Sequence, residues 1–227
     1  MKPTKNTYDT LQNSYDFFNE KLFDNELPHC LITLQRKGKA YGYYSPKRFK
    51  NLSSEDFTDE IALNPIMLVE GNQEAMQTLV HEMCHLWQYH FGSPSRAGYH
   101  NREWASKMES IGLMPSSTGK VGGKKTGQSV ADYALAEDRF LRAFEIWNKD
   151  NVLEWYAIEN SLLQLLQMTN QGGGGLASAL NDDTKPAGAK KNKTKFICPE
   201  CGCNAWGKPS LNLICGDCNR PMETIDE

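Results

Sequence analysis

The chain has 227 residues, which is enough for one full domain and a small additional module. Its net charge of −3 excludes a uniformly basic surface that would coat nucleic acid, but leaves room for a local basic patch. No run approaches the roughly 18 apolar residues of a membrane span, and the N-terminus lacks the apolar segment of a secretory signal, so we expect a cytoplasmic protein that does not act at a membrane.

The first predicted elements are one helix and three strands. Apolar residues recur at helical spacing over residues 8–24, which predicts a helix there. Short β-branched and aromatic runs predict strands at 30–36, 40–45 and 59–63. A turn at residues 37–39 joins the first two of these strands.

Two further helices and a loop follow. The helical pattern returns over residues 74–91, and a loop rich in Gly, Ser and Pro covers 92–99. A second helix is predicted at about 101–112, before a Gly/Ser/Lys-rich loop at 114–127. One helix, three strands and two helices in this order indicate an α+β domain.

The C-terminal half is more varied. Two apolar-periodic segments between residues 134 and 168 predict helices, the second of them strongly amphipathic. A Gly- and Lys-rich stretch then has the composition of a flexible linker. The predicted domains are therefore 1–127, a helical extension at 128–170, a linker at 171–195 and a metal-binding module at 196–227.

The predicted helix 74–91 contains an H-E-x-x-H motif formed by His81, Glu82 and His85. Two residues four apart on a helix differ by about 40° around its axis, so both imidazoles face the same way. That pair suits Zn²⁺, and a carboxylate between the two histidines can act as general base on a water. Cys84 lies off this face and is expected to be a small buried residue.

A catalytic zinc normally takes three protein ligands, so a third must come from elsewhere. His90 is about 140° around the helix from His85 and cannot reach the same metal. His29 lies far upstream on a predicted loop. His100 opens the next helix after a loop that can turn the chain back, and it is the favoured third ligand. Glu103, one helical turn further, stays an alternative.

At this point the chain resembles a known family. The stretch HEMCHLWQYHFGSPSRAGYHNREWASKMESIGL is similar to the SprT-like metallopeptidases, the family that includes Spartan. These proteins pair H-E-x-x-H with a third His about fifteen residues on, in an H-x-x-E/F-F/W context, here His100 to Trp104. Three upstream segments resemble the family too: FFNEKLFDNELP, YGYYSPKRF and EIALNP. The resemblance covers roughly residues 8–113.

The resemblance implies a zincin-like, zinc-dependent protease fold that hydrolyses peptide bonds. It implies that His81, His85 and His100 bind the catalytic zinc and that Glu82 is the general base. Spartan-type members cleave proteins crosslinked to DNA, which implies protein substrates associated with DNA. The alternative is a non-catalytic zinc-containing module that binds DNA or protein.

A second metal site is predicted at the C-terminus. Cys198 and Cys201 form one C-x-x-C pair, and Cys215 and Cys218 form another. In a reducing compartment this pattern indicates metal rather than disulfides, and four thiolates make a closed structural zinc site, a zinc ribbon. Cys203 is a spare cysteine that could replace Cys201. The chain is thus expected to hold one catalytic and one structural zinc.

The ribbon is also a candidate DNA-binding module. Trp206 and Lys208 lie within it, and five lysines without any acidic residue lie between Lys185 and Lys195. Lysines and an aromatic residue suit a nucleic acid. The simpler interpretations are that the ribbon only stabilises the chain end and that the lysines belong to a solvated tether.

Overall fold

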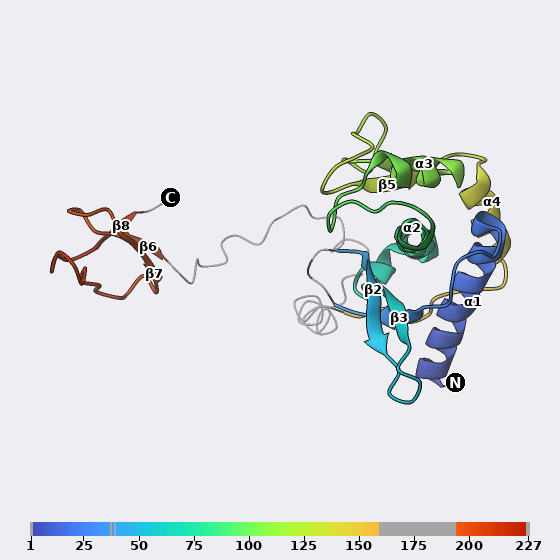
Figure 1. Ribbon diagram of the computed structural model, residues 1–227, viewed down its shortest axis with the longest axis horizontal. Helices are drawn as coiled ribbons and strands as arrows, with labels where there is room; N and C mark the ends of the chain where they lie inside the picture. The colour runs from blue at the N-terminus through green and yellow to red at the C-terminus, as the bar shows by residue number, and fades with distance from the viewer. Residues whose placement is uncertain (1, 37, 39, 159–193, 226–227) are drawn as a thin grey trace, which may run out of the picture. The chain divides into compact units, whose positions relative to one another are not determined.

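The computed structural model describes residues 2–158, except 37 and 39, and residues 194–225. The chain divides into two compact units, Met1–Leu165 and Leu166–Glu227 (Figure 1). Both units mix helix or turn with sheet, as predicted. None of the described helices combines the length and the apolar character needed to cross a membrane.

The first unit begins with helix α1 (Pro3–Phe23), which starts five residues before the predicted helix. Proline is favoured in the first turn of a helix, where its missing N–H costs no hydrogen bond, so Pro3 allows this earlier start. Leu11, Tyr15 and Phe18 are all at most 1% exposed and form the apolar stripe. The helix ends at Asp24, whose φ of 54° is left-handed.

The three predicted strands form one sheet. Strand β1 (Leu31–Leu34) pairs in parallel with β3 (Phe57–Leu63), and β2 (Gly42–Lys50) pairs antiparallel with β3. The order β1-β3-β2 makes β2 an edge strand, and β1 and β2 are not neighbours although they follow one another in the chain. β2 is longer than predicted and has a register shift between Ser45 and Phe49.

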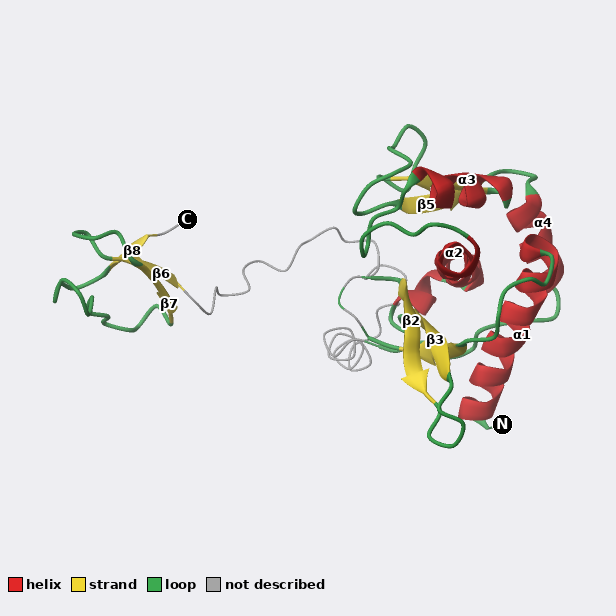
Figure 2. Ribbon diagram, in the orientation of Figure 1, coloured by secondary structure: helices red, strands yellow, loops and turns green. Residues whose placement is uncertain are grey.

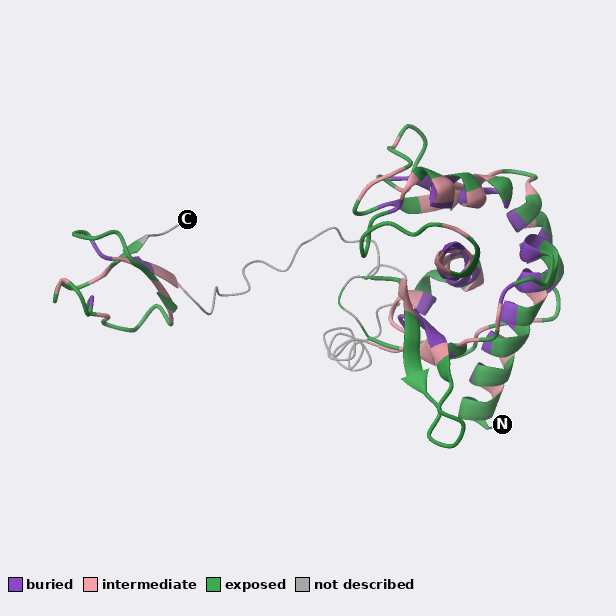
Figure 3. Ribbon diagram, viewed as in Figure 1, coloured by how far each residue is buried: buried purple, intermediate pink, exposed green. Residues whose placement is uncertain are grey.

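A 3-10 turn, η1 (Met67–Glu70), leads into helix α2 (Asn72–Phe91), close to the predicted 74–91. α2 runs through the middle of the unit, between the sheet and helix α3 (Arg102–Ser110) (Figure 2). Buried residues run along α2 and the face of α1 turned toward it (Figure 3). The Asn101 side chain caps α3 by accepting a hydrogen bond from the Trp104 N–H.

A second, two-stranded sheet was not predicted from the sequence: one strand lies at the start of the predicted loop and the other in the predicted helical extension. Strand β4 (Leu113–Ser116) pairs antiparallel with β5 (Ala131–Ala134). Both strands have only four residues, and the long Gly/Ser/Lys-rich connection between them hides the pairing in the sequence. β4 occupies the start of the predicted loop 114–127.

Helix α4 (Arg139–Trp147) follows and packs on α1. Phe18 of α1 lies 6.0 Å from Phe140 and 6.2 Å from Trp147, measured between ring centroids. These side chains belong to the same hydrophobic core as α2 and the first sheet. The first part of the predicted helical extension is therefore built into the core of the unit, while the predicted domain boundaries stay predictions.

The second predicted helical segment is wrong where the structure describes it. Residues 152–158 are not helical. Leu153 N–H donates to the Asn72 side chain, and Ala157 N–H donates to the carbonyl of Pro65. Partners in other segments thus replace the i→i−4 bonds of a helix. The rest of the predicted segment lies outside the described residues, as does the predicted linker up to residue 193.

The described part of the second unit is a small three-stranded sheet joined by turns. Strand β6 (Thr194–Ile197) lies between β7 (Asn204–Gly207) and β8 (Glu223–Ile225), antiparallel to both. Three of its side chains are at most 2% exposed: Phe196, Cys198 and Cys215. So small a core favours additional stabilisation by metal.

Candidate metal centre

Three histidines converge in the first unit. His81 and His85 lie one turn apart on α2, and His100 lies just before α3. Their ring centroids are 4.8 to 5.5 Å apart. One nitrogen from each ring lies within 4.8 Å of the corresponding nitrogens of the other two. The structure therefore brings together the three residues that the sequence predicted as metal ligands.

Hydrogen bonds fix the orientation of two of these rings. His81 Nδ1 donates to Asp132 Oδ1 at 2.7 Å. His100 Nδ1 donates to the carbonyl of Gly127 at 3.3 Å, and the backbones of these two residues also exchange both N–H···O bonds. With Nδ1 occupied, each ring presents Nε2 as its free lone pair, which is the usual arrangement of a metal-ligating histidine.

Trp104 lies under all three histidines. Its ring centroid is 4.8 Å from His81, 5.1 Å from His85 and 4.4 Å from His100, and the His85 ring is stacked on it at 19°. Trp104 is completely buried. Because it contacts each imidazole, this indole forms the rigid floor of the cluster.

The chemistry of this donor set fits zinc. His85 Nε2 and His100 Nε2 lie 3.1 Å apart, close to the roughly 3.3 Å expected between two ligands in a tetrahedral site with Zn–N bonds of about 2.0 Å. Burial, together with the other imidazoles, lowers the pKa of His85 well below its usual value and that of His100 to about 4. Both rings are therefore neutral and able to bind a cation.

His81 has a different environment. Burial lowers its pKa, but the hydrogen bond to Asp132 and the charges of Glu82 and Asp132 raise it more, so the net shift is upward. Two carboxylates thus surround this one imidazole. A cation placed at Nε2 gains from the same negative charges.

The other candidate ligands lie elsewhere. His90 Nε2 donates to Asp59 Oδ2 at 2.7 Å, on the side of α2 that faces the sheet. His29 is exposed, at the end of the segment before β1. Glu103 accepts hydrogen bonds from Gln88 Nε2 and from the backbone N–H of Ser93, in the loop between α2 and α3. None of them joins the three-histidine group.

Asp59 is the centre of a separate buried network. Burial alone would raise the pKa of its carboxyl. Hydrogen bonds from the Lys47 N–H, His90 and Tyr44 lower this pKa by more than burial raises it, so the net pKa lies below the usual value. The side chain is 7% exposed. This network joins the end of α2 to β2 and β3, and its role is structural.

Glu82 lies at the junction of two cavities. It is 6% exposed. One cavity of about 580 Å³ is lined by α2, by β5 and by Tyr41 and Gly42. The other, of about 620 Å³, is lined by Tyr43, Tyr89 and the loop 94–100 among others. Gly42 and Glu82 line both, so the two cavities form arms on either side of the carboxylate.

Gly42 lets β2 approach α2 closely at this junction. A Cβ atom there would lie 2.8 Å from the Ala62 carbonyl oxygen and 2.9 Å from Thr78 Cγ2. It would also lie 3.3 Å from Glu82 Cγ. Only glycine fits between the strand and the helix without displacing one of them.

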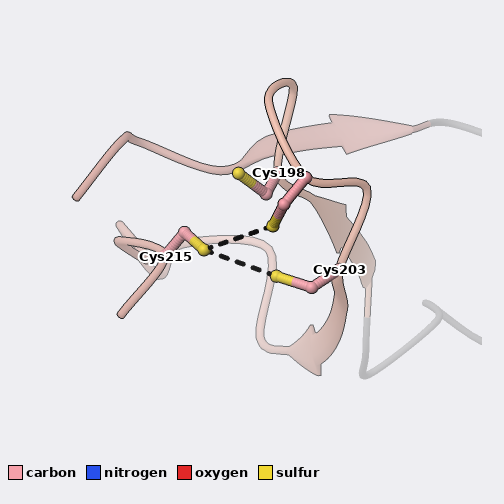
Figure 4. Close-up of side chains that lie close together, drawn as sticks. Cys198, Cys203 and Cys215 are labelled. Carbon is pink, nitrogen blue, oxygen red and sulfur yellow. Dashed lines mark hydrogen bonds between the residues drawn. The ribbon is translucent and has the colours of Figure 1, made fainter. Parts of the chain in front are cut away.

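The ribbon holds a cluster of thiols. Among the residues that the structure describes, Cys198, Cys201, Cys203 and Cys215 have sulfur atoms within 4.8 Å of one another. Cys215 Sγ lies 3.6 Å from Cys201 Sγ. It lies 3.5 Å from Cys203 Sγ, and Figure 4 shows these two thiols pointing toward one another. These separations are close to the roughly 3.8 Å of a tetrahedral site with Zn–S bonds of about 2.3 Å.

Five thiols compete for this site. Cys203 belongs to the four-sulfur group and Cys218, predicted as a ligand, does not. The Cys218 thiol is still within hydrogen-bonding reach of Cys201, and this hydrogen bond raises the pKa of Cys218 to about 12. Backbone N–H groups of Cys218 and Asp217 lower the pKa of Cys215 to about 6, as in a zinc knuckle. The predicted ligand set therefore stays a prediction.

Two contributors to the histidine site were not found in the sequence. Asp132 and Gly127 belong to β5 and to the loop before it, about 50 and 27 residues from their partners. The short run Val130–Ala134 shows no clear alternation of apolar and polar residues, so it gave no strand signal that pointed to Asp132. No spacing rule connects either residue to the histidines.

The comparisons with known proteins agree with this geometry. The SprT-like family model matches residues 11–122, which include the three histidines and Glu82 and end before Asp132. A segment of 59 residues is 64% identical to an uncharacterized protein in the mucB 3' region of Salmonella typhimurium, covering 26% of this chain and 80% of that protein.

Two relatives that carry the family's name match over a smaller share of their own length. Protein SprT from two strains of Klebsiella pneumoniae is 43% identical over 61 residues, which cover 26% of this chain and 34% of each relative. The chain thus matches only about a third of the length of these two relatives. No solved structure matches it. The chain belongs to the SprT-like family.

Proposed function

We propose that the chain is a zinc-dependent peptidase with a zincin-like catalytic unit. In this proposal His81, His85 and His100 hold the metal and Glu82 is the general base. The observation that carries it is the group of three imidazole nitrogens, within 4.8 Å of one another, next to a carboxylate at the junction of two cavities. The neutral state of His85 and His100 supports metal binding at that group.

The residues of the chain would perform most of the reaction. Zinc, when bound, supplies Lewis-acid polarisation of the scissile carbonyl and acidifies a water. Glu82 accepts the proton of the attacking water and delivers it to the leaving amine. Its burial places that carboxylate in a low dielectric, where its interactions with the reacting groups are strong. Trp104 and the hydrogen bonds to Nδ1 keep the imidazoles in place.

The substrate would be an extended polypeptide. β2 is the edge strand of its sheet, and Gly42 and Tyr43 line the cavities beside Glu82. A peptide in extended form can add to such an edge through backbone hydrogen bonds. The two cavities on either side of Glu82 would then receive the substrate side chains that flank the scissile bond.

Glu82→Gln tests this function. The amide is close in size but cannot accept a proton, so the variant should keep its metal content and lose cleavage of a protein substrate. Glu145→Gln, the same change on the exposed face of α4, is the matched control and should cleave as the wild type does. A wild type that holds metal at the histidines but cleaves no protein, with or without DNA, would refute the proposal.

A second candidate concerns where the substrates lie. Trp206 is 62% exposed on β7 and is paired across the strands with Lys195. An exposed aromatic ring beside a lysine suits stacking on bases and contact with phosphate. We propose that the ribbon, with the lysine-rich segment before it, binds DNA and that the peptidase acts on DNA-associated proteins in the reducing cytoplasm.

Trp206→Ala tests this candidate. Loss of a stacking platform should weaken binding of single-stranded DNA by about 5- to 150-fold, the effect of about 1–3 kcal/mol per stacked base. Trp155→Ala is the matched control, since this tryptophan is 49% exposed in the other unit. Equal losses in both variants, in a gel-shift titration at fixed salt, would argue against the ribbon as the DNA-binding module. DNA binding without any proteolysis would favour the non-catalytic alternative.

A further inference from the structure

Asp132 is a buried carboxylate that the catalytic proposal does not require. Its Oδ1 accepts the His81 Nδ1 hydrogen at 2.7 Å, and its side chain is only 6% exposed. It comes from β5, beyond the segment that the family model matches. From this placement we infer that Asp132 is a positioning residue of the metal centre, which holds His81 with Nε2 turned toward the metal.

The backbone around Asp132 is itself tied to α2. Gln77 Nε2 donates to the Asp132 carbonyl oxygen at 3.1 Å. Gln77 precedes His81 by four residues, so both side chains project from the same face of the helix. β5 is held from its other side by β4, where Pro115 is the partner of Asp132. α2 is thus hydrogen-bonded to β5 at two successive turns, through Gln77 and through His81. These two contacts hold the Asp132 carboxylate beside His81.

The second carboxylate oxygen gives the observation that points to a cation. Asp132 Oδ2 is buried and has no hydrogen-bond partner among the described residues. A buried carboxylate oxygen without a partner is unfavourable in the protein alone. A doubly charged ion bound to His81 Nε2 would offset this cost through the imidazole, as in carboxylate–histidine–zinc arrangements. The burial of this negative charge therefore favours the metal-loaded state.

This inference rests on the proposed function only in so far as the three histidines bind a metal. It makes a prediction about metal affinity that does not need proteolysis. Asp132→Asn keeps an oxygen that can accept the His81 hydrogen but removes the charge, whereas Asp132→Ala removes both. Affinity for zinc at the histidine site should therefore fall in that order, within the 10- to 100-fold range typical for loss of such an outer partner.

A purely structural role would have a different signature. If Asp132 only held β5 on α2, its loss would lower the stability of the metal-free chain and leave zinc affinity unchanged. If it acted only as an acidic wall of the cavity, its loss would raise KM for substrates with basic residues. Glu74→Gln provides the matched control, because Glu74 lines the same cavity but is not hydrogen-bonded to a histidine in the structure.

The experiment is a competition titration of the full chain with a chelator, combined with Co²⁺ substitution. Wild type, Asp132→Asn, Asp132→Ala and Glu74→Gln are compared, and the thermal midpoint of each metal-free chain is recorded. We expect a 10- to 100-fold weaker histidine site and an altered visible Co²⁺ spectrum in the two Asp132 variants alone, with metal-free midpoints close to wild type. Wild-type affinity and an unchanged spectrum in Asp132→Ala would overturn the inference. If affinity shifts as expected and the wild type cleaves nothing, the peptidase proposal alone fails.

Discussion

Gly42→Ala is expected to disturb the proposed general base from the opposite wall of the cleft. The new Cβ would lie 2.8 Å from the Ala62 carbonyl oxygen and 2.9 Å from Thr78 Cγ2. Ordinary contact begins at 3.4 Å, so the closer pair is about 0.6 Å too near. The neighbour at 2.8 Å is backbone of β3 and cannot rotate away, so β2 must shift within the sheet. The new Cβ would also press on α2 through Thr78 Cγ2 and through Glu82 Cγ at 3.3 Å, so the Glu82 side chain is displaced.

The size of both effects follows from this displacement. Overpacking at a tight site costs about 1–3 kcal/mol of unfolding free energy. A shift of about 1 Å in a catalytic group can lower the rate about 100-fold, so a shift of roughly half that should lower kcat by about 10-fold. Zinc content should stay at the wild-type value, because none of the three closest atoms belongs to a histidine.

The assay is a protein-cleavage time course with saturating substrate, together with urea unfolding and metal analysis of the same samples. Thr78→Ser removes the methyl group at 2.9 Å and keeps the hydroxyl that donates to the Glu74 carbonyl. Combined with Gly42→Ala, it should restore part of the lost rate. A Gly42→Ala variant with wild-type kcat would show that the contact with β2 does not position Glu82, and the reasoning would fail.

Three further predictions concern the core, pH and the thiols. Trp104→Ala removes the floor of the histidine cluster and should cost about 3–5 kcal/mol and abolish zinc binding there, whereas Trp104→Phe should retain the metal by elemental analysis. The folded-state pKa of Asp59 is lowered, so its ionised carboxylate stabilises the fold above the unfolded pKa of about 3.9 and this stabilisation is lost as the pH falls through the folded-state pKa. Asp59→Asn should therefore lower the free energy of unfolding by about 1–3 kcal/mol at pH 7. Urea unfolding below pH 4 should show a smaller difference between the variant and the wild type. Burial raises the pKa of Cys30 to about 12 and also raises that of Cys84, so after chelation at pH 8 mass spectrometry should find alkylation in the ribbon and none at these two cysteines.

The helices of the first unit could be predicted because their periodicity is a local property. Four apolar residues at helical spacing predicted α1. Helix α2, which carries the H-E-x-x-H motif, begins within two residues of the predicted start. The error at residues 152–158 has the opposite origin. The amphipathic pattern is present, but Asn72 and Pro65 supply partners for the backbone N–H groups there, and tertiary contacts override propensity.

Sheet order was harder to predict than strand position. Short β-branched and aromatic runs located all three strands, but the turn predicted at residues 37–39 suggested that the first two are neighbours, whereas the structure places β3 between β1 and β2. Strands as short as β4 and β5 carry too few residues for a period-2 pattern to stand out.

At the histidine site, residue spacing was enough to predict the functional residues that lie on one helix. His81, Glu82 and His85 share α2, and the predicted loop correctly allowed His100 to turn back toward them. Asp132 could not be predicted, because its link to His81 depends on how β5 packs against α2. The same holds for the thiols, where five cysteines surround a site that needs four.

This division between local and distant contributions determines how metal binding relates to folding. An unfolded chain, or an isolated α2 helix, offers only the pair His81 and His85. The folded unit adds His100, held by Gly127, and the carboxylate behind His81, all from segments that meet only when the second sheet forms. If the three histidines hold a metal as proposed, the folded state binds it far more tightly than the unfolded one. A ligand with that preference stabilises the fold by about 2.7 kcal/mol at a free concentration 100 times its Kd, so a metal at the histidine site would contribute to the stability of the whole unit as well as to its proposed chemistry.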